Sequence, residues 1–243
     1  MVSAPARHPS SLGVIKLLKR KTGTLKYVQQ GGNQSEADRN GVSLSAYIHA
    51  LYGLAIQMPA RDVLMIGCGG GTLATMLARA GKRVTVVDID PASFKIARAH
   101  FKLPRSVTCH VADGLAFLKT TRRRFDLLIV DAFLGEAVPE QFTGDDFCAA
   151  ARRAVRTSGS LLFNVCLDGR RDRTADKLAA RLARNGWPVR LVDQRGESER
   201  NAIVAAGQVR ALRAPRPLIV PDADADRVAR ETRTFQFRRR RAA

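Results

Sequence analysis

The segment Asp62–Thr72, DVLMIGCGGGT, decides the fold of this chain. Its apolar run stops at a glycine-rich turn, and a helical pattern begins at Thr72. Glycine suits such a turn because a Cβ would block a ligand lying against the backbone and would restrict the backbone angles. The start of the following helix offers unpaired N–H groups to a polar or anionic ligand. We therefore predict that Gly67, Gly69 and Gly71 contact a nucleotide-like ligand. Plain packing of a helix on a sheet is the alternative.

Strand-like and helical patterns alternate regularly after this loop. Residues 83–89, RVTVVDI, form a β-branched run, and Asp90-Pro91 then supplies an N-cap and a proline at the first helical position. Continuously apolar runs such as 125–130, FDLLIV, are typical of parallel strands that are covered on both faces. Two runs, 189–193 and 201–207, follow one another without a helix and predict an antiparallel pair. The fold class we predict is α/β, with a doubly wound, mostly parallel seven-stranded sheet.

Two further regions flank this predicted Rossmann-like domain, which we place at 59–210. Residues 1–58 contain two short strand-like runs, 14–18 and 25–29, which predict a β-hairpin, and then a helical pattern over 43–57. Residues 211–243 are rich in proline and arginine, and we expect a basic, partly disordered tail there.

Acidic residues stand at three of the predicted strand ends. Asp88 ends the second strand of the domain, where a carboxylate can accept both hydroxyls of a ribose. Asp113 ends the third strand, in reach of an adenine amino group, and Asp131 ends the fourth, facing the reactive end of a ligand. A single such aspartate is commonly a helix N-cap. Together with the glycine loop, the three predict a ligand that carries a nucleoside.

Composition narrows the class of protein. The chain has 243 residues, of which 45% are hydrophobic. It shows no secretory signal and no apolar run of the ~18 residues that a membrane span needs. The four cysteines are scattered without a C-x-x-C pair, so we predict reduced thiols in a cytoplasmic protein and no metal site.

The net charge of +19 lies mainly on the flanks. Residues 1–30 carry six basic and no acidic residues, and residues 170–243 carry nineteen basic against nine acidic residues. A nucleic-acid footprint is one interpretation. We favour a solvated basic surface instead, because these charge runs lack the interleaved aromatic residues that stack on bases.

The motifs IGCGGG, VVDIDP, VADG and VDAF, in this order, resemble the class I AdoMet-dependent transferases and, among them, the spermidine synthase-like family. The resemblance covers about residues 14–207. It implies AdoMet or decarboxylated AdoMet as the cofactor, with Gln34, Asp88, Asp113 and Gly114 contacting it. It also implies that Asp131 is the catalytic acid or base. A homodimer is a compatible assembly.

This chain departs from that family where a diamine is held. Spermidine synthases carry an aspartate where this chain has Gly70, and a second aspartate where it has Leu134. A desolvated dication needs anionic partners. We therefore expect transfer of a methyl rather than an aminopropyl group to a small-molecule acceptor. Tyr47 and His49 are candidates for lining the acceptor pocket.

Other classes of function stay open at this point. A true polyamine aminopropyltransferase remains one, and a nicotinamide-dependent dehydrogenase could use residues 69–74 as its loop. The antiparallel finish of the sheet and the acid at the third strand argue against the dehydrogenase. A nucleic-acid methyltransferase fits the charge, but Asp131-Ala132-Phe133-Leu134 lacks the motifs of base methylases. A non-catalytic nucleoside-binding or RNA-associated protein would also have lost the diamine-binding residues.

Overall fold

The computed structural model describes residues 6–135, 137–194 and 198–241. The strands of the central sheet are β5 (Asp62–Ile66), β6 (Arg83–Asp88), β7 (Thr108–Val111), β8 (Phe125–Val130), β9 (Val155–Leu167), β10 (Val189–Gln194), β11 (Arg200–Gly207) and β12 (Phe235–Arg238). The helices are α1 (Ala46–Gln57), α2 (Thr72–Arg79), α3 (Pro91–His100), α4 (Gly114–Thr120), α5 (Asp145–Ala154), α6 (Thr174–Arg184) and α7 (Ala225–Arg233), with a short 3₁₀ turn η1 (Glu140–Phe142). A separate small sheet comprises β1 (Ala6–His8), β2 (Ile15–Lys19), β3 (Leu25–Gln29) and β4 (Gly32–Ala37).

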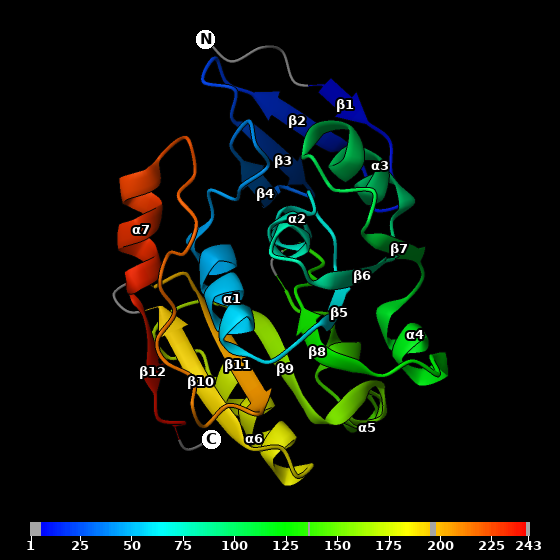
Figure 1. Ribbon diagram of the computed structural model, residues 1–243, viewed down its shortest axis with the longest axis vertical. Coiled ribbons are helices and arrows are strands. Elements are labelled where there is room, and N and C mark those ends of the chain that lie inside the picture. The colour runs from blue at the N-terminus through cyan, green and yellow to red at the C-terminus, as the bar shows by residue number, and fades with distance from the viewer. Residues whose placement is uncertain (1–5, 136, 195–197, 242–243) are drawn as a thin grey trace.

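The central sheet has the order β12-β10-β11-β9-β8-β5-β6-β7 (Figure 1). Strands β5 to β9 pair in parallel, and β10, β11 and β12 join them by antiparallel pairings. The predicted α/β fold is confirmed, and the described residues place eight strands in the sheet instead of the predicted seven. The chain leaves β5 toward β6 on one side and later returns to pair β8 on the other. The ends of β5 and β8 therefore form the switch point where such sheets bind ligands.

Alternate residues of the central strands pack into two apolar cores on opposite faces of the sheet. Val63 and Met65 of β5 pack into the core under α1 and α2, whereas Leu64 and Ile66 pack into the core under α5 and α6. Burial on both faces explains why these strands are apolar throughout, because neither side of the sheet meets water.

The small N-terminal sheet lies at one end of the molecule, close to α3 (Figure 1). The predicted hairpin is present as β2 and β3, and β4 extends it through a polar stretch whose sequence gives little sign of a strand. Tyr27 of β3 is buried against Phe101 and donates a hydrogen bond to Gln29. Gln29 in turn donates to Asp90, the N-cap of α3, at 3.4 Å. The sheet is thereby fixed to the helix that follows β6.

The C-terminal segment, where we expected a basic, partly disordered tail, contains a helix and a strand over residues 225–238. Helix α7 packs beside α1, and β12 pairs with β10 at the edge of the sheet. Arg238 explains why this arginine-rich segment folds. It donates to Asp193 at 2.6 Å and to Asp176 at 2.8 Å, and both of these carboxylates are buried. Within the described part of the chain, no helix is long and apolar enough to cross a membrane.

Candidate active site

The glycine loop and Asp131 are joined at the switch point through their backbones. Gly67 has φ +95°, and a Cβ on it would overlap the carbonyl oxygen of Asp131. The Asp131 N–H also donates to the Ile66 carbonyl at 2.9 Å, next to Gly67. Only glycine fits this combination of positive φ and close approach. Gly67 thus fixes the distance between the glycine loop and the acid at the end of β8.

Strand β4 closes the outer side of the loop through Ser35. The Gly70 N–H donates to Ser35 Oγ at 2.8 Å, and Ser35 Oγ donates to the Gln34 carbonyl at 2.6 Å. A Cβ on Gly70 would lie 2.9 Å from both Ser35 and Phe101, closer than real Cβ contacts permit. With Ser35 and Phe101 placed as they are in this chain, position 70 has no room for a larger side chain.

Asp88 and Asp113 stand at the ends of β6 and β7 and are already partnered. Asp88 accepts from the Cys68 N–H at 2.7 Å and from the Asp90 N–H at 2.8 Å, one on each oxygen. Burial raises the pKa of Asp88, and these two hydrogen bonds oppose the rise. Asp113 caps α4 by accepting from the Ala116 N–H, and its other oxygen accepts from Gln141 at 2.8 Å. Each carboxylate oxygen keeps one lone pair for a ligand.

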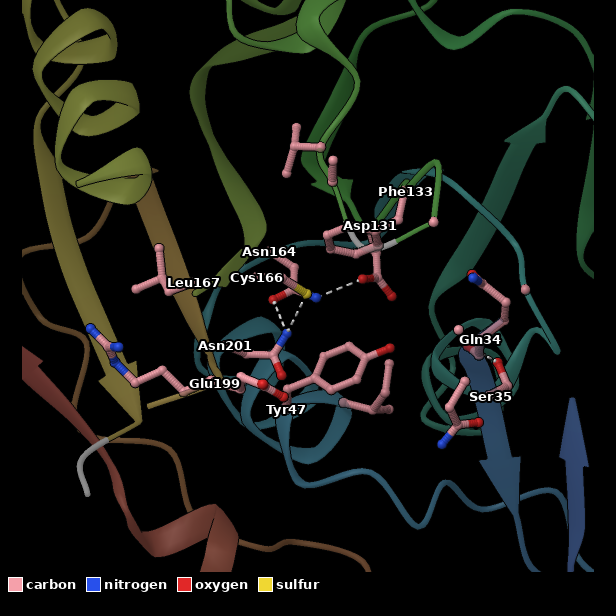
Figure 2. Close-up of a pocket in the computed structure, with 18 of the residues that line it drawn as sticks. Gln34, Ser35, Tyr47, Asp131, Phe133, Asn164, Cys166, Leu167, Glu199 and Asn201 are labelled. Atoms are coloured by element: carbon pink, nitrogen blue, oxygen red, sulfur yellow. Dashed lines mark hydrogen bonds between the residues drawn. The ribbon is translucent and has the colours of Figure 1, made fainter. Parts of the chain in front are cut away.

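Asp131 faces a cavity at the end of β8. Its Oδ1 accepts from Asn164 Nδ2 at 2.8 Å, and Asn164 Oδ1 accepts from Asn201 Nδ2 at 3.1 Å (Figure 2). No hydrogen bond from a described residue reaches Asp131 Oδ2. Burial raises the pKa of Asp131 to about 6, although the Asn164 hydrogen bond lowers it. A carboxyl group with a pKa near neutrality can both accept and return a proton.

The cavity has a volume of about 790 Å³ and runs along the carboxyl ends of β5, β8 and β9. We call its two sides the glycine-loop wall, formed by Gln34, Ser35 and Gly69, and the acceptor wall, formed by Asn164, Cys166, Glu199, Arg200 and Asn201. Figure 2 shows Asp131 between the two walls, with Tyr47 of α1 beneath them. Besides Asp131, the acids Asp168, Asp172 and Glu199 line the cavity, whereas the Arg200 guanidinium is turned to Asp193 at 2.8 Å.

Three of the predicted site residues line this cavity, namely Gln34, Gly69 and Asp131. The other predicted cofactor contacts lie outside its lining and stay predictions: Gly67, Gly71, Asp88, Asp113 and Gly114. Two of them also have packing roles. Gly71 is the N-cap of α2 and has φ +69°, and a Cβ on Gly114 would lie 2.5 Å from Ile66.

The two candidates on α1 behave differently. Tyr47 lines the cavity, and burial together with the nearby charge of Asp131 raises the pKa of its phenol, which keeps it protonated. His49 is fully buried and its Nε2 bonds the Ser43 carbonyl at 2.7 Å, so the prediction that it lines the acceptor pocket is wrong.

The sequence prediction missed Asn164 and Asn201. A signal for Asn164 was present, since it is the one polar side chain in the buried run Leu161–Val165. A buried amide requires hydrogen-bond partners. Asn201 carries no such signal, because only the antiparallel pairing of β9 with β11 brings it beside Asn164.

Comparisons with known proteins agree with the fold. A methyltransferase-domain family matches residues 63–159, from β5 into β9. This match covers less than half of the chain, and the α/β fold resembles that of class I AdoMet-dependent transferases.

The fold resembles that of spermidine synthase-like proteins over nearly all of the chain, as the motifs indicated. A probable spermidine synthase from Corynebacterium glutamicum superposes with a TM-score of 0.80 at 18% identity, over 98% of this chain and 91% of that one.

Sequence relatives include enzymes named for two different transfers. A polyamine aminopropyltransferase of Vibrio vulnificus is 29% identical over 122 residues, which cover 47% of this chain and 41% of that protein. An eEF1A lysine and N-terminal methyltransferase homolog of Drosophila pseudoobscura pseudoobscura is 34% identical over 122 residues, which cover 44% of this chain and 18% of that protein. This chain therefore spans less than half the length of both relatives, and their names support methyl and aminopropyl transfer alike.

Proposed function

We propose that this protein binds AdoMet or decarboxylated AdoMet and transfers an alkyl group, methyl rather than aminopropyl, to a small-molecule acceptor. The observation that carries the proposal is Asp131, whose free oxygen faces a cavity that begins at the glycine loop. The site residues fit such a cofactor. Gly69 leaves bare backbone at the cavity, and Asp88 keeps a free lone pair on each oxygen for ribose hydroxyls.

The chemistry asked of the protein is modest. A bound sulfonium supplies an already activated alkyl carbon. Asp131 would orient a nucleophile on the acceptor and take its proton on Oδ2, while Tyr47 and the two walls exclude water. The acids of the cavity, Glu199 among them, favour an acceptor that carries a cationic or amine group, since buried charge requires an opposite partner.

Methyl transfer is favoured because this chain lacks the two acids that hold a diamine in the spermidine synthase-like family. Position 70 is closed by Ser35 and Phe101, and Leu134 is an exposed apolar side chain where the family has an acid. A diamine would therefore lack the two carboxylates that the family places at these positions.

Calorimetry with AdoMet, decarboxylated AdoMet and NADH tests the cofactor. We expect the first two to bind, Asp88→Ala to abolish their binding, and the exposed control Asp226→Asn on α7 to leave it unchanged. Binding of NADH alone would overturn the proposal.

Mass-spectrometric analysis of products from a panel of amines tests the transfer. Asp131→Asn should reduce the transfer rate by about 10²- to 10⁴-fold, as loss of a general base does, while cofactor affinity stays within about threefold. Efficient conversion of putrescine with decarboxylated AdoMet would establish an aminopropyltransferase instead.

A further inference from the structure

We propose that Asn164 and Asn201 form a positioning relay that holds Asp131 as a base, with its free oxygen turned to the acceptor. The role of the relay in catalysis rests on the proposed function, in which Asp131 is the base. Its physical content, the orientation of one buried amide and one carboxylate, can be measured without any substrate.

The relay consists of two hydrogen bonds with a fixed direction. Asn164 is 1% exposed, so its amide must be satisfied by protein groups. Its Nδ2 donates to Asp131 at 2.8 Å, and its Oδ1 accepts from Asn201 Nδ2 at 3.1 Å. An isolated asparagine can exchange its oxygen and nitrogen by rotation. An ionised Asp131 can only accept, so it selects the orientation in which Asn164 presents its N–H groups to the carboxylate, and Asn164 Oδ1 is then left to accept from Asn201 Nδ2.

Strand register explains why the three side chains meet. Val130, the last residue of β8, pairs with Phe163 of β9, so Asp131 and Asn164 come next on neighbouring parallel strands. Antiparallel pairing places Asn201 of β11 opposite Cys166, two residues beyond Asn164 on the same face. Asn201 Nδ2 also reaches Cys166 Sγ at 3.5 Å, which holds the amide over the sheet.

The direction of the relay decides which form of Asp131 is favoured. An N–H aimed at Oδ1 stabilises the carboxylate and disfavours a proton on that oxygen. A proton taken from the acceptor is then received on Oδ2, which faces the cavity. If Asn164 were reversed, its carbonyl would face Oδ1, repel the carboxylate and favour the protonated acid.

Other titratable groups around Asp131 do not replace the relay. Tyr47 on α1 and Cys166 on β9 share its surroundings, and burial raises the pKa of Tyr47. Asp168, Asp172 and Glu199 line the same cavity on the loops and are acids themselves. The cation of this wall, Arg200, is paired with Asp193. Asn164 is thus the donor that the described residues direct at Asp131.

The test is a carboxyl ¹³C NMR titration of the full chain labelled at aspartate, without cofactor or acceptor. The Asp131 signal is identified by its loss in Asp131→Asn. Asn164→Leu removes the donor with little change of volume and should raise the pKa of Asp131 by about one unit or more, as expected for a hydrogen bond to a charged group. Asn201→Ala frees the Asn164 amide and should raise the pKa by a smaller amount.

Ser160→Ala is the matched control, because Ser160 is buried on the same strand and bonds Gln208 instead of the relay. It should leave the Asp131 titration within about 0.3 unit of wild type, well below the effect of a lost donor. Should Asn164→Leu fail to fold, Asn201→Ala carries the test alone. An unchanged Asp131 pKa in a folded Asn201→Ala protein overturns the relay. If wild type does not bind AdoMet but the variants show the expected shifts in the Asp131 pKa, the proposed function is overturned and the relay is not.

Discussion

The glycine-loop wall and the acceptor wall enclose the same cavity but are built from different parts of the chain. The first is held by backbone groups and small residues, as in the contact of Gly70 with Ser35. The second is held by side chains on the antiparallel end of the sheet, such as Asn164 and Asn201. Backbone geometry tolerates little change, whereas side chains can vary on a constant sheet. We therefore expect substitutions on the acceptor wall to be tolerated by the fold more readily than substitutions in the glycine-loop wall.

The largest expected effect comes from removing Arg238, which supports the acceptor wall through Asp193. Arg238→Ala should destabilise the protein by about 3 to 5 kcal/mol, because it leaves Asp176 and Asp193 as buried charges that have lost a partner. Asp193 also holds Arg200 of the acceptor wall. Urea unfolding measures the loss, and the exposed Arg239→Ala is the control. Equal stability of the two variants would show that β12 does not support this wall.

The next effect tests the rigidity of the glycine-loop wall. Gly67→Ala should cost about 2 to 4 kcal/mol, since a Cβ there meets the Asp131 carbonyl at a positive φ. Gly81→Ala has a similar φ of +79° with nothing within 4 Å, so it reports the backbone strain alone. Denaturant unfolding of both variants separates the two contributions. A Gly67 variant as stable as the Gly81 variant contradicts the close approach.

Asp131 links the two walls and gives a pH-dependent prediction. Its pKa of about 6 in the folded state lies above that of an unfolded aspartate, about 3.9, so the folded protein binds more protons between these values. Its contribution to stability is therefore present at pH 4 and is lost as the pH rises through 6, by about 3 kcal/mol at most. Asp131→Asn should be more stable than wild type at pH 7 by about 1 to 3 kcal/mol.

Thermal unfolding across pH 4–8 measures this difference between Asp131→Asn and wild type. The gain should vanish near pH 4. A variant that is less stable than wild type at pH 7 would mean that the carboxylate is stabilised by the fold.

The smallest expected effect concerns the contact that closes the glycine loop. Ser35→Ala leaves the Gly70 N–H without its acceptor and should cost about 1 to 2 kcal/mol. Cofactor affinity, measured by calorimetry, should fall with it. A matching loss from Ser43→Ala, whose hydroxyl lies at the start of α1 and does not contact the loop, would attribute the effect to general destabilisation.

Local patterns were sufficient to predict most of the sheet. The apolar runs of β5, β6 and β8 and the capped start of α3 are visible over a few residues, and the aspartates at the strand ends follow from them. The chain gave no local sign of β12, because four residues, FQFR, become a strand only through pairing with β10 and the ion pairs of Arg238. Ser35 and Asn201 were missed for the same reason, since their partners lie 35 and 37 residues away.

The acids of the cavity have a kinetic consequence in a chain whose net charge is +19. At long range a cationic acceptor meets a field of its own sign, and only within the cavity does it meet Glu199 and Asp131. Added salt shortens the Debye length to about 8 Å at physiological ionic strength and screens the outer repulsion more than the inner attraction. The encounter rate of such an acceptor should therefore rise with moderate salt, opposite to the usual behaviour of steered association.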